Sequence, residues 1–574
     1  MTPQNMGQFL QLLRKAGELV EITSPVNPHL EIAEIHRRVS AGGGPALLFS
    51  NVKDSAFPIV SNLFGSKKRL SMALGGNIEE KIGRFLDILS SPPALSHLQT
   101  YLSLLKVGTS KRKRGPILEH QLKPDLNSIP FTTSWPADGG AFLTQPLVYT
   151  QDPASDHENL GMYRIQRFSQ DTAGLHWQMG KGGGFHYQKA EELNLPLPIT
   201  IFLGGPPALT ISGIAPLPEH LSELLFASFL LGKKLSLCKT DPLPLISECD
   251  IAITGYANPN ERRLEGPFGD HFGYVDPARP FPVFHCTHIH HRKGAIVPIT
   301  VVGKPFQEDA CIGNCITSLF KPCLRFLIPN LADIHTYSEA GFHSLATIQV
   351  RSRYKKEALT TALRVLGEGQ LSLTKSLIVV DQDVALNDIR AVLTHFLERF
   401  SPEEDVIVLP HTSTDTLDIA STKLNHGAKI ILLGTGSKKR TLPHKTPPTL
   451  SISTDLFCPG CLLVSGPSYN EMPDPTALLN ETAIASWPLI IFVDDVNTCS
   501  GSTTEFLWQT FTRFDPGQDL HASGITVCRN GVSFSLPIAF DARTKPSYPP
   551  VVKRDETTAT MVSRNWHEYF PEDK

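Results

Sequence analysis

The sequence predicts a multi-domain protein of mixed α/β and α+β class. The chain has 574 residues, and at about 150 residues per domain this length suggests roughly two to four packed units. Its two ends alternate helical and strand-like segments, whereas residues 140–305 carry short alternating apolar segments broken by Gly and Pro. The first pattern is typical of α/β packing, and the second is typical of an antiparallel sheet or barrel.

The N-terminal region is expected to form an α/β layer. Apolar residues recur at helical spacing between 6 and 40, and a strand-like segment lies at 19–22. A glycine-rich turn then leads into short strands at 46–49 and 57–63. Prolines crowd residues 92–135, which predicts a linker or a domain boundary because proline removes backbone donors.

The central and C-terminal regions differ in their expected strand direction. One helix, at 219–231, interrupts the antiparallel centre, whereas strands and helices alternate beyond residue 340 and favour a parallel sheet. Two similar units occur there, each with a buried strand, an aspartate and a helical pattern: 376–380 with Asp381 and 389–400, then 488–493 with Asp494 and 505–511. We interpret them as a weak internal repeat, although chance similarity of buried parallel strands explains them nearly as well.

The charge balance argues against a nucleic-acid partner. Lys and Arg total 53 against 56 Asp and Glu, and the net charge of -3 provides no broad positive field. The basic run 111–114 is interpreted as a solvated loop before Pro116. The N-terminus lacks an export signal, and no apolar stretch approaches the roughly 20 residues needed to cross a bilayer. We expect a cytoplasmic protein that meets membranes, if at all, only peripherally through a lipophilic substrate.

The cysteines and one group of histidines are assigned no function. Ten cysteines, most of them in apolar surroundings, indicate a reducing compartment. Cys458-Pro-Gly-Cys461 lacks a second pair at zinc-ribbon spacing, which disfavours a redox or zinc role. The group of histidines lies within a strand-like run. Because neighbouring side chains of a strand point to opposite faces, this pattern disfavours a metal site. The members of the group are His285, His288, His290 and His291.

Three stretches hold most of the polar side chains that a functional site needs: 159–184, 218–223 and 265–271. Their Asn, His and Glu residues suit a divalent ion such as Mn²⁺ or Mg²⁺, and three protein ligands leave positions open for phosphate oxygens. Lys181 and the glycines after it could hold that phosphate through a point charge and backbone N–H groups. Each stretch is ambiguous alone, because a glycine run is usually a loop.

Glu265 and Asp270 form a pair of carboxylates separated by a Gly-Pro-Phe-Gly turn. We expect them on the same rim of a pocket, where mutual repulsion and desolvation would raise one pKa and create a proton donor. Arg164 carries an always-charged fork that can pin a substrate carboxylate or hold a glutamate ionised.

Several motifs together resemble a known family. The N-terminal part reads Gly43-Gly-Pro-Ala-Leu-Leu-Phe49 and Asn62-Leu-Phe-Gly65, and the middle reads Asn159-Leu-Gly-Met-Tyr-Arg164. Glu265-Gly-Pro-Phe-Gly-Asp-His-Phe-Gly-Tyr274 follows, and Lys429 precedes Thr435 near the C-terminal sheet. With these motifs most of the chain resembles the UbiD family of decarboxylases, which work with prenylated FMN. The resemblance implies an N-terminal α/β domain at 1–120, a split β-barrel that binds the flavin at 121–325, and a C-terminal α/β oligomerisation domain at 326–574.

The same resemblance implies a role for individual residues. Asn159, His176 and Glu223 would hold Mn²⁺ or Mg²⁺ on the flavin phosphate, with K⁺ as a further candidate ion. Arg164, Glu265 and Asp270 would form the catalytic set, with Asp270 as the proton donor. The residues implied in cofactor binding are Asn159, Met162, Tyr163, Arg164, His176, Trp177, Gln178, Lys181, Gly182, Glu223 and Lys429.

The sequence departs from the family pattern at two places. His176 and Lys181 stand where some quinone-pathway members have arginines, although other members have His at the first position. The segment after Lys429 lacks the aspartate usual there, and Phe540-Asp-Ala-Arg-Thr-Lys545 resembles the missing segment. Which of Lys429 and Lys545 meets the flavin is therefore left open, and the second αβ unit has no assigned role.

The resemblance implies non-oxidative decarboxylation of a polyprenyl-hydroxybenzoate or naphthoate precursor in ubiquinone or menaquinone biosynthesis. A flavin prenyltransferase would supply the cofactor, and a homo-oligomer, dimer or hexamer, is expected. Two other functional classes remain as alternatives to a decarboxylase. An FMN-dependent oxidoreductase would need an electron-donor site, and no Gly-x-Gly-x-x-Gly follows a strand. Loss of Glu265 or Asp270 would have indicated a non-catalytic assembly protein on the same fold, but both residues are present.

Overall fold

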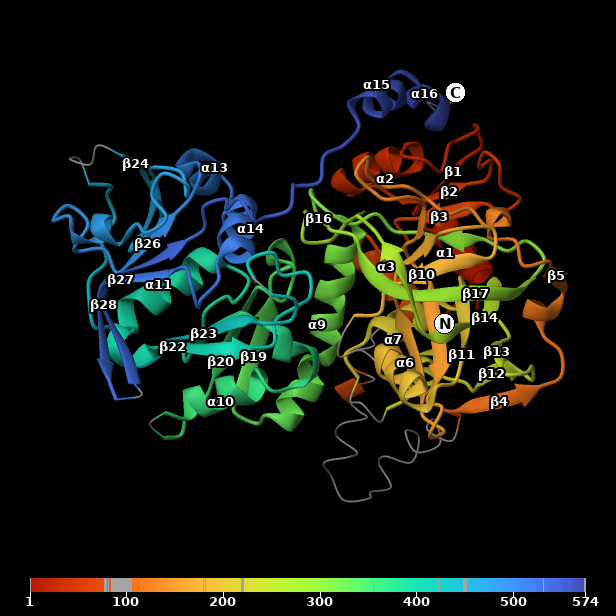
Figure 1. Ribbon diagram of the computed structural model, residues 1–574, viewed down its shortest axis with the longest axis horizontal. Helices are drawn as coiled ribbons and strands as arrows, with labels where there is room; N and C mark the ends of the chain where they lie inside the picture. Colours follow the sequence, from red (N-terminus) through yellow and green to blue (C-terminus); the bar gives the residue numbers. More distant parts are fainter. Residues whose placement is uncertain are drawn as a thin grey trace. The chain divides into compact units, whose positions relative to one another are not determined.

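The chain folds into two compact units. The computed structural model describes residues 2–76, 80, 82–83, 106–178, 180, 182–217, 221–354, 356–421, 423–447, 452–529 and 531–571. Unit 1 comprises Met1–Leu319 and Pro550–Lys574, and unit 2 comprises Phe320–Pro549 (Figure 1). Residues 92–105 of the expected linker lie outside the described part. The final segment packs in unit 1, although the sequence boundaries grouped it with residues 326–549.

A small mixed sheet and three helices form the N-terminal part of unit 1. The strand order is β1-β2-β3-β18, with β1 parallel to β2 and β2 antiparallel to β3. Helix α1 begins where the Asn5 side chain accepts from the Gln8 backbone N–H, and it buries Phe9 and Leu13 at helical spacing. The bounds are α1 Met6–Lys15, β1 Leu19–Ile22, α2 Glu31–Ala41, β2 Ala46–Phe49, β3 Ile59–Ser61, α3 Lys67–Leu74 and β18 Val297–Pro298.

A nine-stranded antiparallel sheet forms the centre of unit 1, as the alternating pattern predicts. Its order is β6-β9-β10-β17-β14-β11-β7-β8, with β5 on β17. Among the described strands no pairing closes the sheet into a barrel. Its strands are β5 His120–Leu122, β6 Phe142–Leu143, β7 Leu147–Gln151, β8 Glu158–Met162, β9 Ile165–Arg167, β10 Thr172–Leu175, β11 Leu197–Leu203, β14 Ile251–Glu265 and β17 Arg279–His291.

The two sheets of unit 1 share one hydrophobic core. Ile22 and Leu47 of the small sheet belong to the same buried cluster as Ile201 and Ile253 of the large one. A boundary between them at residue 120 therefore does not coincide with a break in apolar packing.

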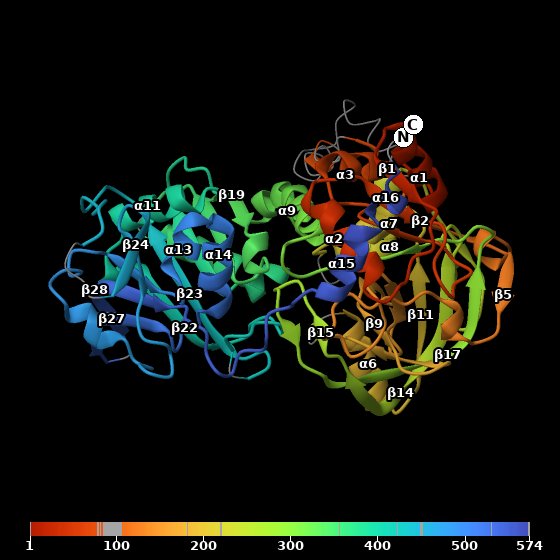
Figure 2. The ribbon, with the colours of Figure 1, turned by 90° about the horizontal axis from the view of Figure 1, so that it is seen from above.

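Short strands and helices complete unit 1 (Figure 2). The basic run is exposed, as expected, but Lys111 and Arg112 lie in strand β4 rather than in a loop. The bounds are β4 Thr109–Arg112, η2 Pro116–Leu118, η3 Leu126–Ser128, α6 Gly182–Leu193, α7 Pro207–Ile214, α8 Glu223–Leu231, β12 Leu235–Cys238, β13 Leu245–Ile246, β15 Phe268–Gly269, β16 Val275–Asp276, α15 Glu556–Arg564 and α16 Trp566–Tyr569. Helix α9, Glu308–Leu327, contains residues of both units.

Unit 2 contains two five-stranded sheets of identical topology, which confirms the internal repeat. The orders are β19-β20-β21-β23-β22 and β24-β25-β26-β28-β27. In each sheet the outer two pairings are antiparallel and the inner two are parallel. The strands are β19 Leu331–Thr336, β20 Leu345–Val350, β21 Ser376–Val380, β22 Val406–Thr412, β23 Gly427–Gly434, β24 Ser453–Cys458, β25 Cys461–Ser465, β26 Leu489–Phe492, β27 Leu520–Cys528 and β28 Gly531–Asp541.

Both sheets of unit 2 contribute to one core with the helices between them. Ile430 of the first sheet and Ile491 of the second lie in the same buried cluster as Phe396 of α11 and Phe506 of α14. The helices and 3₁₀ turns are η4 Ser338–Ala340, α10 Glu357–Val365, η5 Gly369–Leu373, α11 Ile389–Arg399, α12 Pro402–Asp405, η6 Thr476–Asn480, α13 Val496–Gly501 and α14 Thr503–Arg513. No helix in the described ranges is both long and apolar enough to cross a bilayer.

Candidate active site

Arg164 lies in the turn between β8 and β9 and contacts three carboxylates. Its Nε donates to Glu265 Oε1 at 2.8 Å, and its Nη2 donates to Glu265 Oε2 at 3.0 Å. Its Nη1 donates to Asp270 Oδ2 at 2.8 Å, and Nη2 also donates to Asp276 Oδ2 at 2.8 Å. The Phe268 ring lies 4.5 Å from the guanidinium carbon. The structure therefore brings the three expected catalytic residues together and adds Asp276.

The four charged groups are buried, so their interactions are strong. Their exposed fractions are 9% for Arg164, 0% for Glu265, 8% for Asp270 and 6% for Asp276. Burial alone would lower the pKa of Arg164, but the bonds to Glu265 and the charges of the carboxylates raise it. The guanidinium thus stays charged at the centre of an excess of negative charge.

The prediction that one carboxylate of the Glu265 and Asp270 pair has a raised pKa is wrong. Burial favours the protonated form of Glu265, but hydrogen bonds from His176 and Arg164 outweigh it and lower its pKa to about 2. For Asp270 burial is outweighed by the charge and hydrogen bond of His271 and by Arg164, and its pKa is again about 2. Repulsion between the two carboxylates is thus outweighed by the contacts that Arg164, His176 and His271 make with them.

Asp276 is the carboxylate of the cluster whose pKa is raised. Burial is the largest cause, and the charge of Asp270 adds to it, while Arg164 and Arg279 oppose it. Its second oxygen accepts from Arg279 Nη1 at 2.9 Å. Asp276 was missed from the sequence, although it pairs with Phe268 across the β15–β16 hairpin and so lies beside Asp270.

Backbone pairing from another part of unit 1 supports this hairpin. The Val275 N–H donates to Pro550 O at 2.9 Å, and the Val552 N–H donates to Gly273 O at 3.0 Å. Tyr274 and Val551 form an antiparallel bridge. The turn that holds Asp270 and Asp276 is therefore completed by a segment from the far end of the chain.

A second group gathers where helix α6 begins. A Cβ added to Gly182 would lie 2.1 Å from Asn159 Oδ1, and one added to Gly183 would lie 2.6 Å from Trp177 Nε1. Asn159 Nδ2 and Trp177 Nε1 are buried donors that have no hydrogen-bond partner in the described part of the chain. Buried donors of this kind are costly unless a ligand satisfies them. The glycines and these donors form a narrow, donor-rich cradle at a helix N-terminus.

Glu223 belongs to this second group. It opens α8, and its Oε2 accepts from the Leu160 N–H at 3.1 Å, next to Asn159. Burial raises its pKa to about 6. The Tyr163 hydroxyl accepts from the Gly183 N–H at 3.4 Å, and burial raises the pKa of Tyr163 to about 12. Asn159, Glu223 and Tyr163, which the resemblance places at the cofactor, therefore lie in one group with Gly183.

His176 connects the two groups. Its Nδ1 lies 2.9 Å from Glu265 Oε2, and its ring centroid is 4.2 Å from that of Phe281. The next residue, Trp177, lies against Gly183. Two consecutive side chains therefore reach the carboxylate cluster and the cradle.

The remaining predicted residues are more dispersed. Met162 ends β8 and Gln178 follows Trp177, both half-buried, whereas Lys181 lies outside the described residues. In unit 2 Lys429 donates to Ser372 O at 2.7 Å and to Thr374 O at 2.9 Å. Lys545 is paired with Asp519.

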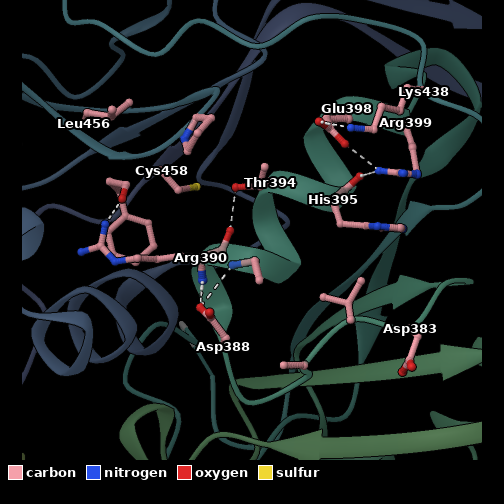
Figure 3. Close-up of a pocket in the computed structure, with 15 residues that line it drawn as sticks. Asp383, Asp388, Arg390, Thr394, His395, Glu398, Arg399, Lys438, Leu456 and Cys458 are labelled. Carbon is pink, nitrogen blue, oxygen red and sulfur yellow. Dashed lines mark hydrogen bonds and ion pairs between the residues drawn. The ribbon is translucent and has the colours of Figure 1, made fainter.

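The histidines of β17 and a cavity in unit 2 include none of the predicted site residues. No group of three or more His, Cys, Asp or Glu in the described ranges is arranged to hold a metal. The expected metal ligands Asn159, His176 and Glu223 include only two residues of these four types. The histidines of β17 are dispersed along the sheet, where His285 contacts Glu261 at 2.8 Å and His291 stacks on His120. A cavity of about 880 Å³ in unit 2, between α11 and the β24–β25 hairpin, is lined by none of the predicted site residues (Figure 3).

Three sequence profiles match this chain. They are the N-terminal, Rift-related and C-terminal domains of 3-octaprenyl-4-hydroxybenzoate carboxy-lyase, at residues 10–89, 109–305 and 310–434. The second sheet of unit 2 lies beyond the last match.

Relatives align over nearly the whole chain. An uncharacterized protein of Chlamydia trachomatis is 47% identical over 99% of this chain and 100% of its own length. A 4-hydroxybenzoate decarboxylase component from Chlamydia pneumoniae is 45% identical, covering 98% of both chains.

Solved structures share the fold. The vanillic acid decarboxylase of Sedimentibacter hydroxybenzoicus in its closed form has a TM-score of 0.68 at 23% identity, covering 84% of this chain and 100% of that one. The UbiD-class enzyme HmfF of Pelotomaculum thermopropionicum, in complex with FMN, has a TM-score of 0.63 at 24% identity, covering 75% and 93%. Together with the matched domains and the relatives, these findings show that the chain belongs to the UbiD family of carboxy-lyases.

Proposed function

We propose that the protein removes CO₂ from an aromatic or otherwise unsaturated carboxylic acid without net oxidation, using prenylated FMN. The observation that carries the proposal is the buried Arg164 with its carboxylates, joined through His176 and Trp177 to a donor-rich cradle. The name of the Chlamydia pneumoniae relative and the HmfF structures with FMN and prenylated FMN support it.

The cradle fits the phosphate of a flavin. Gly182 and Gly183 let the backbone approach closely, and the unpartnered Asn159 Nδ2 and Trp177 Nε1 supply donors. Asn159, Glu223 and His176 offer oxygen and nitrogen ligands for Mn²⁺ or Mg²⁺ on that phosphate, with K⁺ as a further candidate. Met162, Tyr163, Gln178 and Lys181 would complete the flavin site within unit 1.

Decarboxylation leaves an electron pair on carbon, and the prenylated flavin supplies an electrophilic group that accepts it. Arg164 donates through Nε, once through Nη1 and twice through Nη2 to protein carboxylates. A guanidinium has five N–H bonds, so one Nη1 hydrogen remains to orient the substrate carboxylate. Glu265 holds Arg164 through both carboxylate oxygens and contacts His176 through Oε2.

Asp270 is positioned to deliver the proton that replaces CO₂. Its Oδ1 lies 2.5 Å from His271 Nδ1, and the His271 side chain is 26% exposed. A proton can therefore pass from solvent through His271 to Asp270, which is ionised in the free protein because its pKa is about 2.

The finer assignments follow from the family. We propose a phenolic or naphthoic acid from ubiquinone or menaquinone synthesis as substrate, and the large antiparallel sheet as the split barrel of the flavin domain. A flavin prenyltransferase would supply the cofactor, and the chain would assemble as a dimer or hexamer in the cytoplasm.

Expression together with a flavin prenyltransferase tests the proposal. We expect prenylated FMN in the mass spectrum of the released cofactor, and CO₂ from at least one acid in an aromatic panel. Asp270→Asn should keep the flavin but lose turnover and deuterium exchange into the product. Retained turnover would rule out Asp270 as the donor, whereas reduction of the bound flavin by NADH without CO₂ release would favour an oxidoreductase.

A further inference from the structure

Three carboxylates already share the Arg164 guanidinium before any substrate arrives. Glu265, Asp270 and Asp276 all bind Arg164, and the other cation within contact of Asp276 is Arg279. The groups that face Asp276 are thus Arg164 from the β8–β9 turn, Asp270 from the β15–β16 turn and Arg279 from the start of β17. Three carboxylates thus share two guanidinium groups, while Asp270 is also faced by His271 and His176.

A substrate carboxylate at the last Nη1 hydrogen of Arg164 would add a further negative charge. In a buried site such a charge strongly disfavours ionisation of its neighbours. Asp270 and Asp276 are the carboxylates that share the guanidinium with the incoming anion through Nη1 and Nη2. Binding of the anion should therefore be coupled to the uptake of a proton by this pair.

We propose that Asp276 is a positioning residue. Because of Asp276, the binding of the substrate anion causes Asp270 to take up the proton that is used in catalysis. By holding Nη2 of Arg164 at 2.8 Å, Asp276 directs the free Nη1 edge toward the substrate. By its negative charge it opposes ionisation of Asp270 once the anion is bound. The inference rests on the proposed function, because it needs an aromatic carboxylate to bind at Arg164.

Proton uptake on ligand binding tests this directly and does not depend on turnover. Holoenzyme made with a flavin prenyltransferase is titrated with 4-hydroxybenzoate by calorimetry in buffers of different ionisation enthalpy near neutral pH. We expect uptake of close to one proton per bound anion in the wild type and clearly less in Asp276→Asn. Equal uptake in both proteins, or no binding at millimolar ligand, would overturn the inference.

The pH profile of kcat provides a second measurement, in which two variants are expected to shift the alkaline limb in opposite directions. Neutralising Asp276 lowers the pKa of the acid in the complex, so the alkaline limb of kcat should move to lower pH by about one unit in Asp276→Asn. Arg279→Gln removes a cation, so the limb should move to higher pH. Glu261→Gln, on β14 but outside the cluster, should leave the limb in place. Slower turnover in Asp276→Asn with an unmoved limb would indicate a merely structural role.

The two proposals fail differently. If no acid of the panel releases CO₂ while proton uptake still depends on Asp276, the proposed reaction is wrong and the anion site stands. If CO₂ is released and Asp276→Asn changes neither uptake nor the pH limb, the reaction stands and the role of Asp276 is wrong.

Discussion

Arg164 in unit 1 and Arg543 in unit 2 are both buried guanidinium groups, but their surroundings differ. Arg543 is 2% exposed and makes a bidentate pair with Asp541 at 2.9 and 2.6 Å. Its remaining bonds go to the carbonyls of Pro467 and Met472 at 2.8 and 2.9 Å. One cation meets one anion, and two carbonyls accept two of the other three N–H hydrogens.

Arg164 instead meets three carboxylates, and unpartnered buried donors lie in the adjoining cradle. A balanced ion pair fixes a fold, whereas a guanidinium shared by three carboxylates beside unsatisfied buried donors indicates that a ligand completes the site. The segment around Arg543 resembles a family motif, but its charges are already balanced within unit 2.

Replacing each arginine by lysine should separate the two roles most strongly. Arg164→Lys keeps the charge but loses the fork, so turnover per bound flavin should fall by about 10²-fold or more. Arg543→Lys should leave turnover per folded protein unchanged and lower the free energy of unfolding by about 1–3 kcal/mol. CO₂ release and denaturant unfolding measure the two effects. A similar fall in turnover for both variants would contradict the distinction.

The cradle allows a matched pair of smaller changes. In Gly183→Ala the new Cβ would lie 2.6 Å from Trp177 Nε1, so Trp177 must move and the bound flavin per chain should fall by about half or more. In Gly184→Ala the nearest atom is Gln178 O at 3.2 Å, and flavin content should stay near that of the wild type. Flavin absorbance after desalting is the measurement, and equal retention in both variants would argue against a phosphate site here.

The two halves of unit 2 differ in how they hold a buried lysine. Lys429 donates to carbonyls, and burial lowers its pKa to about 8, whereas Lys545 is paired with Asp519. Between pH 8 and 10.5 the unfolded chain binds more protons at Lys429, so the free energy of unfolding should rise with pH by about 3 kcal/mol.

Unfolding of Lys429→Met across this range checks the sign. The variant should lack the rise and be more stable than the wild type at neutral pH. Lys545→Met, which leaves Asp519 buried without its cation, should be less stable at neutral pH. If both variants lose stability there, Lys429 is compensated by groups other than the carbonyls.

Helices and strands with a clear spacing or run of apolar residues could be predicted from the sequence. The spacing of Phe9 and Leu13 predicted α1, and the buried runs 376–380 and 488–493 predicted the central strands of both repeats. The identity of the two topologies could not be predicted, because strand order depends on contacts between segments far apart in sequence.

The site was predictable only in part. Arg164 and Glu265 are 101 residues apart, and their pairing followed from the family motifs rather than from periodicity. Asp276 was missed because β15 and β16 have two residues each, too few to show alternation. The pKa values of Glu265 and Asp270 were misjudged because His176 and His271 contribute through contacts that spacing does not show.

The pairing of Pro550 and Val552 with Val275 and Gly273 gives unit 1 a dependence on synthesis order. Unit 2 is an insertion within unit 1, so its two sheets are translated before the segment that pairs with the β15–β16 hairpin. A ribosome-bound chain that ends before residue 550 should thus contain the cradle and all the carboxylates but lack the backbone pairing that supports this hairpin.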